Sequence, residues 1–286
     1  MTCLVSTHWL AEQLQQPQSQ LHIFDASMMN VVGREPLEYE QLQVIPGAKW
    51  LGLEQELTDL EARLPNSFPR PEQVTERLQK LGVNQGDTVV LYDNQGIYSA
   101  PRAWVILAAM GLENVVILDG GLPQWLAHGY PWVGDYAQAP QQRGNVVAGL
   151  QPQWLVDSQQ VLAASEQRQA LICDARGAAR FCGQQPEPRP GMRSGHIPHA
   201  VNIPFAEVLD GHCYRTPEQL AARFAAAGAR CDMPIITTCG SGITACVLFV
   251  AAFIAGYRDV KLYDGSWAEW GATPDLPVAT TGTAPN

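Results

Sequence analysis

The strongest constraint on the fold is that this 286-residue chain contains one sequence pattern twice, in the same order. Four segments recur, and the pairs are residues 21–26 and 171–175, 45–48 and 197–200, 89–98 and 235–244, and 118–125 and 263–270. The third pair, 89–98 with 235–244, aligns without a gap. A pattern repeated in this way predicts two copies of one domain rather than a single large domain.

Each half alternates apolar strand patterns with helical stretches, such as Pro71 to Leu81 and Pro217 to Ala227. This alternation predicts an α/β fold in which each copy is a mainly parallel sheet flanked by helices. A polar stretch that is interrupted by proline lies between the halves and is typical of a linker. The expected organisation is a first domain over residues 1–136, a linker over 137–150 and a second domain over 151–286.

Cys239 stands at the end of an apolar run and at the start of a glycine-containing loop that leads into a long apolar helix. Gly240 and Gly242 can adopt positive φ angles, which turn successive backbone N–H groups inward, and a helix that begins near Thr244 adds its positive end. Such a cradle stabilises an anion on sulfur and favours a nucleophilic thiolate. The predicted active-site loop is Gly240, Ser241, Gly242, Ile243 and Thr244, all of them uncharged.

The gapless alignment places Asp93 of the first half where the second half has Cys239. The first copy therefore lacks the thiol. A duplicated domain that keeps its fold but loses the nucleophile is expected to be a non-catalytic partner that contributes packing and part of a cleft.

Composition excludes several classes of function. The formal net charge is −10 and the pI is near 5.0, with no basic stretch, which argues against nucleic-acid or anionic-membrane partners. The longest apolar run, Ala245 to Tyr257, is shorter than the ~20 residues of a membrane-spanning helix. Seven scattered cysteines without a C-x-x-C pattern indicate neither a disulfide framework nor a zinc site, and reduced thiols fit the cytoplasm.

Four motifs together resemble the two-domain rhodanese-type sulfurtransferases, and the 3-mercaptopyruvate branch matches best. The motifs are Cys239-Gly-Ser-Gly-Ile-Thr244, Asp174-Ala-Arg-Gly-Ala-Ala-Arg180-Phe, Glu187-Pro-Arg189-Pro-Gly191 followed by Gly195-His-Ile-Pro198, and Tyr263-Asp-Gly-Ser-Trp267. The resemblance covers nearly the whole chain and implies two tandem rhodanese-like domains, the second of them catalytic.

The resemblance implies that Cys239 carries sulfur as a persulfide, and that Arg180 and Arg189 bind the carboxylate and keto oxygens of 3-mercaptopyruvate. An arginine fork suits a small anion with a planar carboxylate. The expected acceptor is a thiol such as that of thioredoxin, or cyanide in an assay, and pyruvate is released. No metal or organic cofactor is expected.

The sequence departs from the family in its first half. In residues 50–65 Glu54 stands where an aspartate is usual, and no histidine is present, with Arg63 or a neighbour in its place. A proton relay through Ser241, as in the family, is therefore disfavoured. His199 also stands where a glycine is common in the turn that it occupies.

Two other functions remain as alternatives. A thiosulfate sulfurtransferase would share the fold, but such members carry basic residues between the cysteine and the threonine of the loop. A non-enzymatic persulfide carrier or sensor would need only Cys239. A cysteine phosphatase is disfavoured because its loop ends in a phosphate-binding arginine, whereas Ala245 stands here.

Several conspicuous residues are expected to be structural. Asp174 and His196 recur in scaffold segments and are assigned to hydrogen bonding within the fold. Arg176 and Arg193 do not match the binding positions and are assigned structural or surface roles. Core positions are expected for the sulfur of Cys246 and for the indoles of Trp50, Trp104 and Trp125.

Overall fold

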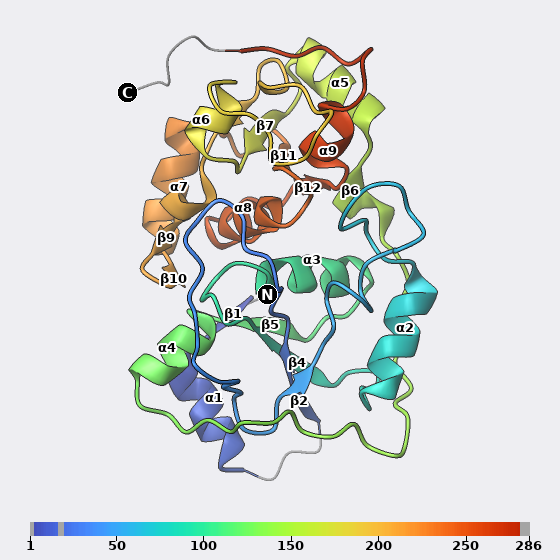
Figure 1. Ribbon diagram of the computed structural model, residues 1–286, viewed down its shortest axis with the longest axis vertical. Helices are drawn as coiled ribbons and strands as arrows, with labels where there is room; N and C mark the ends of the chain where they lie inside the picture. Colours follow the sequence, from blue (N-terminus) through green and yellow to red (C-terminus); the bar gives the residue numbers. More distant parts are fainter. Residues whose placement is uncertain (1–2, 17–19, 281–286) are drawn as a thin grey trace. The chain divides into compact units, whose positions relative to one another are not determined.

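The computed structural model describes residues 3–16 and 20–280. It divides into two compact units (Figure 1). Unit 1 comprises residues 1–59, 68–151 and 210–214, and unit 2 comprises residues 60–67, 152–209 and 215–286. The short segment 60–67 thus belongs with the second half of the chain, a feature that becomes important at the cysteine loop.

Unit 1 is built on a five-stranded parallel sheet with the order β1-β5-β4-β2-β3. Its strands are β1 (Leu4–Val5), β2 (Leu21–Asp25), β3 (Lys49–Trp50), β4 (Thr88–Tyr92) and β5 (Val115–Leu118). Its helices are α1 (Thr7–Leu14), α2 (Pro71–Lys80), α3 (Ala100–Ala109) and α4 (Gly121–Ala127).

Unit 2 repeats this arrangement, with a parallel sheet in the order β6-β12-β11-β7-β8. Its strands are β6 (Leu155–Val156), β7 (Leu171–Asp174), β8 (Val201–Asn202), β11 (Ile235–Thr238) and β12 (Val260–Tyr263). Its helices are α5 (Ser158–Gln167), α6 (Ala178–Phe181), α7 (Pro217–Ala226), α8 (Thr244–Ile254) and α9 (Ser266–Trp270), with 3₁₀ turns at η1 (Pro152–Trp154) and η2 (Phe205–Val208). A small hairpin is formed by β9 (Leu209–Asp210) and β10 (Cys213–Tyr214).

The predicted fold class is confirmed, because each half is an α/β unit with a parallel sheet between helices. Successive side chains of a strand point to opposite faces of the sheet, so each sheet packs against helices on both of its faces. In β4, Val90 and Tyr92 pack with α1 and α4 in one core, and the opposite face of the strand packs against α3. Unit 2 follows the same plan, with α5 and α9 on one face and α8 on the other.

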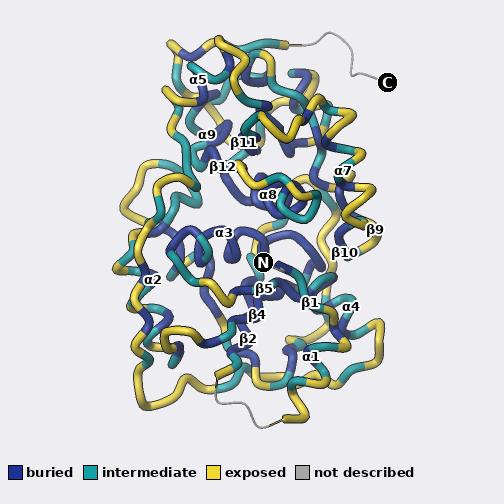
Figure 2. The backbone as a smooth tube through the Cα atoms, turned by 180° about the vertical axis from the view of Figure 1, so that it is seen from behind, coloured by how far each residue is buried: buried dark blue, intermediate teal, exposed yellow. Residues whose placement is uncertain are grey.

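Helices α3 and α8 are buried almost all round, and in Figure 2 both appear largely dark blue. A helix that is apolar on every side belongs in the interior of a protein. In α8 this burial starts at Thr244, directly after the cysteine loop. The loop is therefore fixed at both ends, by β11 before it and α8 after it. No helix in the described residues is long and apolar enough to cross a membrane.

The helix at Pro217 begins as its sequence predicts. The Thr216 side chain caps the backbone N–H of Gln219, the Gln219 side chain returns the bond, and Pro217 occupies the first turn. The predicted linker region runs along unit 1, where Gly144 N–H donates to Gln79 and Gly149 N–H donates to Met110. Residues up to 151 accordingly belong to unit 1.

The core prediction for three tryptophans is correct for Trp104 and Trp125, which are each 1% exposed. It is wrong for Trp50, which is 38% exposed and lies under the guanidinium of Arg77 at 5.3 Å. Trp50 ends a two-residue strand at the edge of the sheet, where one side has no neighbouring strand to cover it. The Arg77 guanidinium stacks on the Trp50 indole and covers one face of the ring in place of the protein core.

His199 adopts a left-handed conformation with φ of 63° in the turn before β8. The matching residue of the first copy is Gly47, with φ of 81°. Both copies of the turn therefore need a positive φ, and only the first copy uses the residue that adopts it without a steric cost. The histidine that stands at position 199 in place of glycine therefore adopts a strained backbone conformation in this turn.

Replacing His199 with glycine should raise the free energy of unfolding by about 1 kcal/mol, because it removes the strain of a left-handed side-chain residue. Urea unfolding of the two proteins measures the difference. The matched control is Gly47→His, where an added Cβ meets no atom within 4 Å, and it should lose a similar amount of stability. An unchanged free energy of unfolding in both variants would show that the left-handed conformation of His199 is not strained.

Candidate functional site

Cys239 lies at the carboxyl end of β11 and is only 2% exposed. Its backbone N–H donates to Ser266 Oγ at 3.2 Å, and its carbonyl accepts from the N–H of Trp267 at 2.9 Å. The next carbonyl, that of Gly240, accepts from Ala268 at 2.9 Å. These bonds tie the start of the loop to α9, so the position of the thiol is held by the backbone on both sides.

The two loop glycines serve different purposes. Gly242 has φ of 80°, as the sequence predicts. The positive φ expected at Gly240 is wrong, because Gly240 is not among the described residues with positive φ. A Cβ at Gly240 would lie 3.1 Å from Nη2 of Arg180. Glycine is therefore favoured there by the close approach of an arginine rather than by the backbone angle, since a larger residue would displace the guanidinium by a few tenths of an ångström.

The corresponding loop of unit 1 holds an anion. The carboxylate of Asp93 accepts hydrogen bonds from the backbone N–H groups of Gln95, Tyr98, Ser99 and Ala100 at 2.8–3.0 Å. Burial raises the pKa of Asp93, and the four N–H donors oppose that shift. The loop backbone of this repeat is thus an anion cradle, and Asp93 stands at the position of Cys239.

Arg180 and Arg176 share one buried carboxylate in unit 2. Glu187, whose side chain is 0% exposed, bonds to Nη2 and Nε of Arg180, the latter at 3.3 Å. Its Oε1 also accepts from Nη1 of Arg176 at 2.7 Å. The Arg180 side chain is 13% exposed, so Glu187 fixes a guanidinium that still reaches the surface beside Gly240.

Ser241 connects the loop to two polar side chains. Its Oγ accepts from Nδ2 of Asn66 at 2.9 Å and lies 3.5 Å from Nη2 of the exposed Arg189. Asn66 belongs to the segment 60–67 that joins unit 2, and its φ is 57°. Within residues 60–67 the side chain that bonds the loop serine is that of Asn66, where the sequence predicts Arg63 or a neighbour in place of the histidine. An amide can donate to the hydroxyl, but it does not titrate as histidine does.

The residues assigned structural roles have them. Arg176 binds the Asp174 carboxylate through two nitrogens and lies over the Trp267 ring at 4.3 Å. Burial opposes the charge, and the carboxylates of Asp174 and Glu187 outweigh it and raise the pKa of Arg176. His196 Nδ1 bonds the Phe181 carbonyl at 2.8 Å, and burial lowers the pKa of this histidine.

The remaining buried or tethered residues near the loop are also structural. Arg193 donates to five backbone carbonyls between residues 270 and 276 and so ties this segment to the rest of unit 2. Cys246 is fully buried, and its thiol donates to the Gly242 carbonyl at 3.1 Å. Cys246 therefore stabilises the loop from within α8.

Of the predicted site residues, the structure brings Cys239, Arg180, Arg189 and the loop 240–244 together in unit 2. Sequence analysis missed two residues that position them, Glu187 and Asn66. Glu187 lay within a quoted motif, and its place two residues before Arg189 was the available signal. The described residues contain no group of three or more His, Cys, Asp or Glu side chains that could hold a metal ion.

Comparison with known proteins agrees with this arrangement. A model of the rhodanese-like domain matches residues 6–128 and again residues 157–273. The chain is 41% identical over 280 residues to a 3-mercaptopyruvate sulfurtransferase of Escherichia coli K12, a match that covers 97% of this chain and 98% of that protein. A protein of the same description from Rattus norvegicus is 36% identical over 93% of this chain and 91% of its own length.

The fold is also similar to a solved structure. The crystal structure of SseA from Escherichia coli, described as a 3-mercaptopyruvate sulfotransferase, superposes with a TM-score of 0.81 at 38% identity. The match covers 93% of this chain and 99% of that one.

Proposed function

Because this chain belongs to the rhodanese family, we propose that it is an enzyme that transfers the sulfur atom of 3-mercaptopyruvate to a thiol acceptor and releases pyruvate. Relatives with this activity in their names match over nearly the full length of the chain. The cysteine loop of unit 2 is the reaction centre, and unit 1, with Asp93 in place of the thiol, is the non-catalytic copy.

The reaction has two steps with Cys239 as the nucleophile. The thiolate attacks the sulfur of 3-mercaptopyruvate, an S–S bond forms, and the C–S bond breaks. The electron pair of the broken bond leaves on carbon as pyruvate enolate, which takes a proton from water to give pyruvate. An acceptor thiolate then attacks the outer sulfur of the persulfide and restores the Cys239 thiolate.

The observation that carries this proposal is the anion cradle of the repeated loop. In unit 1 four backbone N–H groups bind the Asp93 carboxylate. The gapless alignment gives the loop of unit 2 the same length between the strand and the helix. A loop that holds a carboxylate in one copy is suited to hold the anionic outer sulfur of a persulfide in the other.

Arg180 and Arg189 supply the charge that a small keto acid requires. Both guanidiniums lie beside the loop, Arg180 against Gly240 and Arg189 against Ser241. A guanidinium binds a planar carboxylate through two parallel hydrogen bonds and stabilises the developing enolate oxygen. The loop between Cys239 and Thr244 carries no charge of its own, which favours the monoanion 3-mercaptopyruvate over the dianion thiosulfate.

The proposal is tested by steady-state kinetics with both donors, using a dithiol acceptor and following pyruvate and sulfide separately. We expect kcat/KM for 3-mercaptopyruvate to exceed that for thiosulfate by roughly tenfold or more, a difference of about 1.4 kcal/mol. A preference for thiosulfate would assign the chain to the other branch. No turnover with either donor would favour a non-enzymatic persulfide carrier.

Replacing Arg189 or Arg180 with alanine should raise the KM for 3-mercaptopyruvate roughly 10- to 100-fold, because each removes a charge-assisted hydrogen bond of about 1.5–3 kcal/mol. Initial rates over a range of substrate concentrations measure this. Arg189→Ala is the cleaner variant, because Arg180 is also part of a buried ion pair. The control is Arg230→Ala, whose side chain is 68% exposed and pairs with Asp232. Unchanged KM values in both arginine variants would contradict the assignment.

Asn66→Ala should lower kcat/KM about two- to tenfold, the worth of one neutral hydrogen bond to a loop side chain. The matched measurement is a double-mutant cycle with Ser241→Ala. If the two residues act through their mutual bond, the double variant loses no more than the single variants. Fully additive losses would show that Asn66 acts elsewhere.

We also propose that the protein works in a reducing compartment such as the cytoplasm, with a thiol protein such as thioredoxin as the acceptor. None of the seven cysteines, all of which lie in the described residues, forms a disulfide, and a persulfide cycle requires Cys239 in its thiol form.

A further inference from the structure

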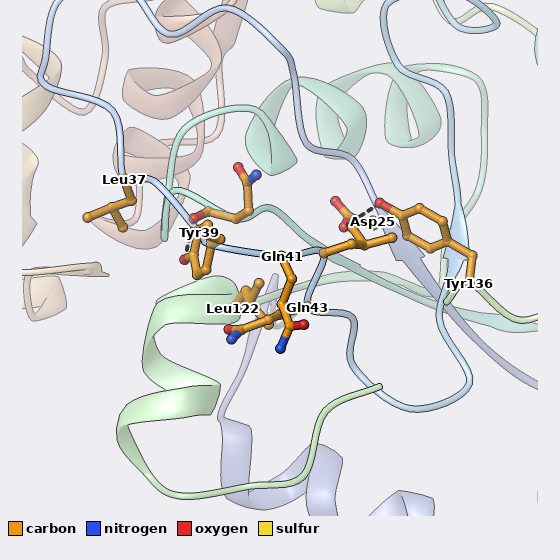
Figure 3. A pocket seen from close by; sticks show the side chains of 9 residues that line it. Asp25, Leu37, Tyr39, Gln41, Gln43, Leu122 and Tyr136 are labelled. Atoms are coloured by element: carbon orange, nitrogen blue, oxygen red, sulfur yellow. Dashed lines mark hydrogen bonds between the residues drawn. The ribbon is translucent and has the colours of Figure 1, made fainter. Parts of the chain in front are cut away.

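A cavity of about 300 Å³ opens beside the carboxylate of Asp25 in unit 1 (Figure 3). Asp25 ends β2, and the cavity lies at the same carboxyl edge of the sheet as the Asp93 loop, to which the lining residue Asn94 belongs. The lining residues are Asp25, Leu37, Tyr39, Gln41, Leu42, Gln43, Asn94, Leu122 and Tyr136. Nothing in the proposed sulfur transfer uses this site.

The corresponding place in unit 2 is filled by side chains. There Asp174, the counterpart of Asp25, is clamped by the guanidinium of Arg176, which in turn lies over the ring of Trp267 at 4.3 Å. In the repeat alignment Arg176 corresponds to Ser27, and Trp267 corresponds to Leu122. Unit 1 therefore keeps the buried carboxylate but replaces the cation and the aromatic ring above it with smaller groups, and Leu122 lines the resulting cavity.

Asp25 accepts hydrogen bonds, but no salt bridge joins it to a cation among the described residues. Its Oδ1 accepts from the N–H of Ser27 at 2.8 Å and from the Ser27 hydroxyl, and its Oδ2 accepts from Tyr136 Oη at 3.1 Å. No lysine, arginine or histidine is among the described residues that line the cavity. Burial of this uncompensated carboxylate raises its pKa, and the negative charge of Asp93 adds to the shift. A cation placed in the cavity would relieve that cost.

The lining side chains themselves offer acceptors and aromatic surface rather than positive charge, and the Arg34 guanidinium acts on Tyr39 from outside the lining. Tyr39 donates its hydroxyl proton to the Asn94 carbonyl at 2.7 Å, and Tyr136 donates to Asp25, so both phenol oxygens present lone pairs to a donor. In Figure 3 the two tyrosines stand at opposite sides of the group, with the amides of Gln41 and Gln43 beside Leu122. Burial raises the pKa of Tyr39 to about 12, and both phenols remain neutral at physiological pH.

We propose that this cavity binds a small organic cation of the guanidinium class, which takes the place that the Arg176 guanidinium occupies in the other copy. The planar cation donates to the Asp25 carboxylate and lies against the tyrosine rings, while a short apolar substituent contacts Leu122. The site lies in the unit without the cysteine nucleophile, so its test is independent of the proposed sulfur transfer.

The test is isothermal titration calorimetry of the full-length protein with methylguanidinium chloride, at concentrations far below those that unfold proteins. Its neutral counterpart of nearly the same shape is N-methylurea. We expect saturable binding of methylguanidinium and at least tenfold weaker binding of N-methylurea. Equal affinity for the two probes, or no saturable binding of methylguanidinium, would overturn the proposal.

Variants locate the site. Asp25→Asn keeps the shape of the side chain and should weaken methylguanidinium binding at least tenfold. Asp135→Asn, an exposed neighbour of Tyr136 with the same change of net charge, should leave it unaltered. Leu42 is a lining residue that is 47% exposed, and Leu42→Trp should obstruct the cavity and weaken binding without altering any charge. This variant tests the site independently if Asp25→Asn fails to fold. Wild-type affinity in Leu42→Trp together with an unchanged Asp25→Asn would contradict the site.

Discussion

Replacing Cys239 with serine should reduce pyruvate release from 3-mercaptopyruvate by roughly 10³-fold or more, because a hydroxyl at neutral pH is a far weaker nucleophile toward sulfur than a thiolate. The change is one atom at a buried position that is only 2% exposed, held by the backbone bonds to Ser266 and Trp267. Folding should therefore be preserved, and the loss should appear in kcat. Stopped-time assays of pyruvate with excess dithiol measure it.

The matched control is Cys231→Ser, an exposed cysteine of the same unit. It should keep wild-type rates, because Cys231 lies outside the loop. Near-wild-type turnover by Cys239→Ser, or a comparable loss in Cys231→Ser, would contradict the assignment of the nucleophile.

Replacing Glu187 with glutamine should lower the free energy of unfolding by about 3–5 kcal/mol, the cost of leaving buried charges without their partner. The carboxylate is 0% exposed and serves both Arg176 and Arg180, whose side chains are 1% and 13% exposed. Glutamine has the same shape but no charge, so Arg176 would keep only the Asp174 carboxylate and Arg180 would lose the Glu187 carboxylate. Because Arg180 would also lose its anchor, the KM for 3-mercaptopyruvate should rise.

Glu207→Gln provides the comparison for this prediction. Glu207 bonds Nε of Arg223 at 2.8 Å, but the two side chains are 48% and 28% exposed, and such a pair contributes within about 1 kcal/mol. Urea unfolding followed by tryptophan fluorescence measures both variants. Equal small losses in the two would mean that the Glu187 bridge does not support the site.

The repeat, the strands and the helix boundaries could be predicted because each depends on local sequence pattern. The helix expected over Pro71 to Leu81 is found at Pro71–Lys80, and that expected over Pro217 to Ala227 is found at Pro217–Ala226. The position of the cysteine loop could be predicted for the same reason, since the strand, the glycines and the helix are adjacent in the chain. Local chemistry was sufficient for these features.

What could not be predicted depends on pairing across irregular segments. Asn66 bonds Ser241, which lies 175 residues further along the chain, and the segment 60–67 that holds Asn66 contains no strand or helix. Residue type predicts a positive φ at Gly240, whereas the structure shows instead a close approach of the Arg180 side chain, which the sequence does not encode. The exposure of Trp50 likewise depends on its place at a sheet edge, which residue type does not encode.

The most direct test of the account is to expose the protein to 3-mercaptopyruvate without an acceptor and locate the transferred sulfur by peptide mass spectrometry. We expect one pyruvate released per chain and one added sulfur atom, which is found on the peptide that contains Cys239 and is discharged when a thiol is supplied. Sulfur on any of the other six cysteines, or pyruvate release without sulfur bound to the protein, would contradict it.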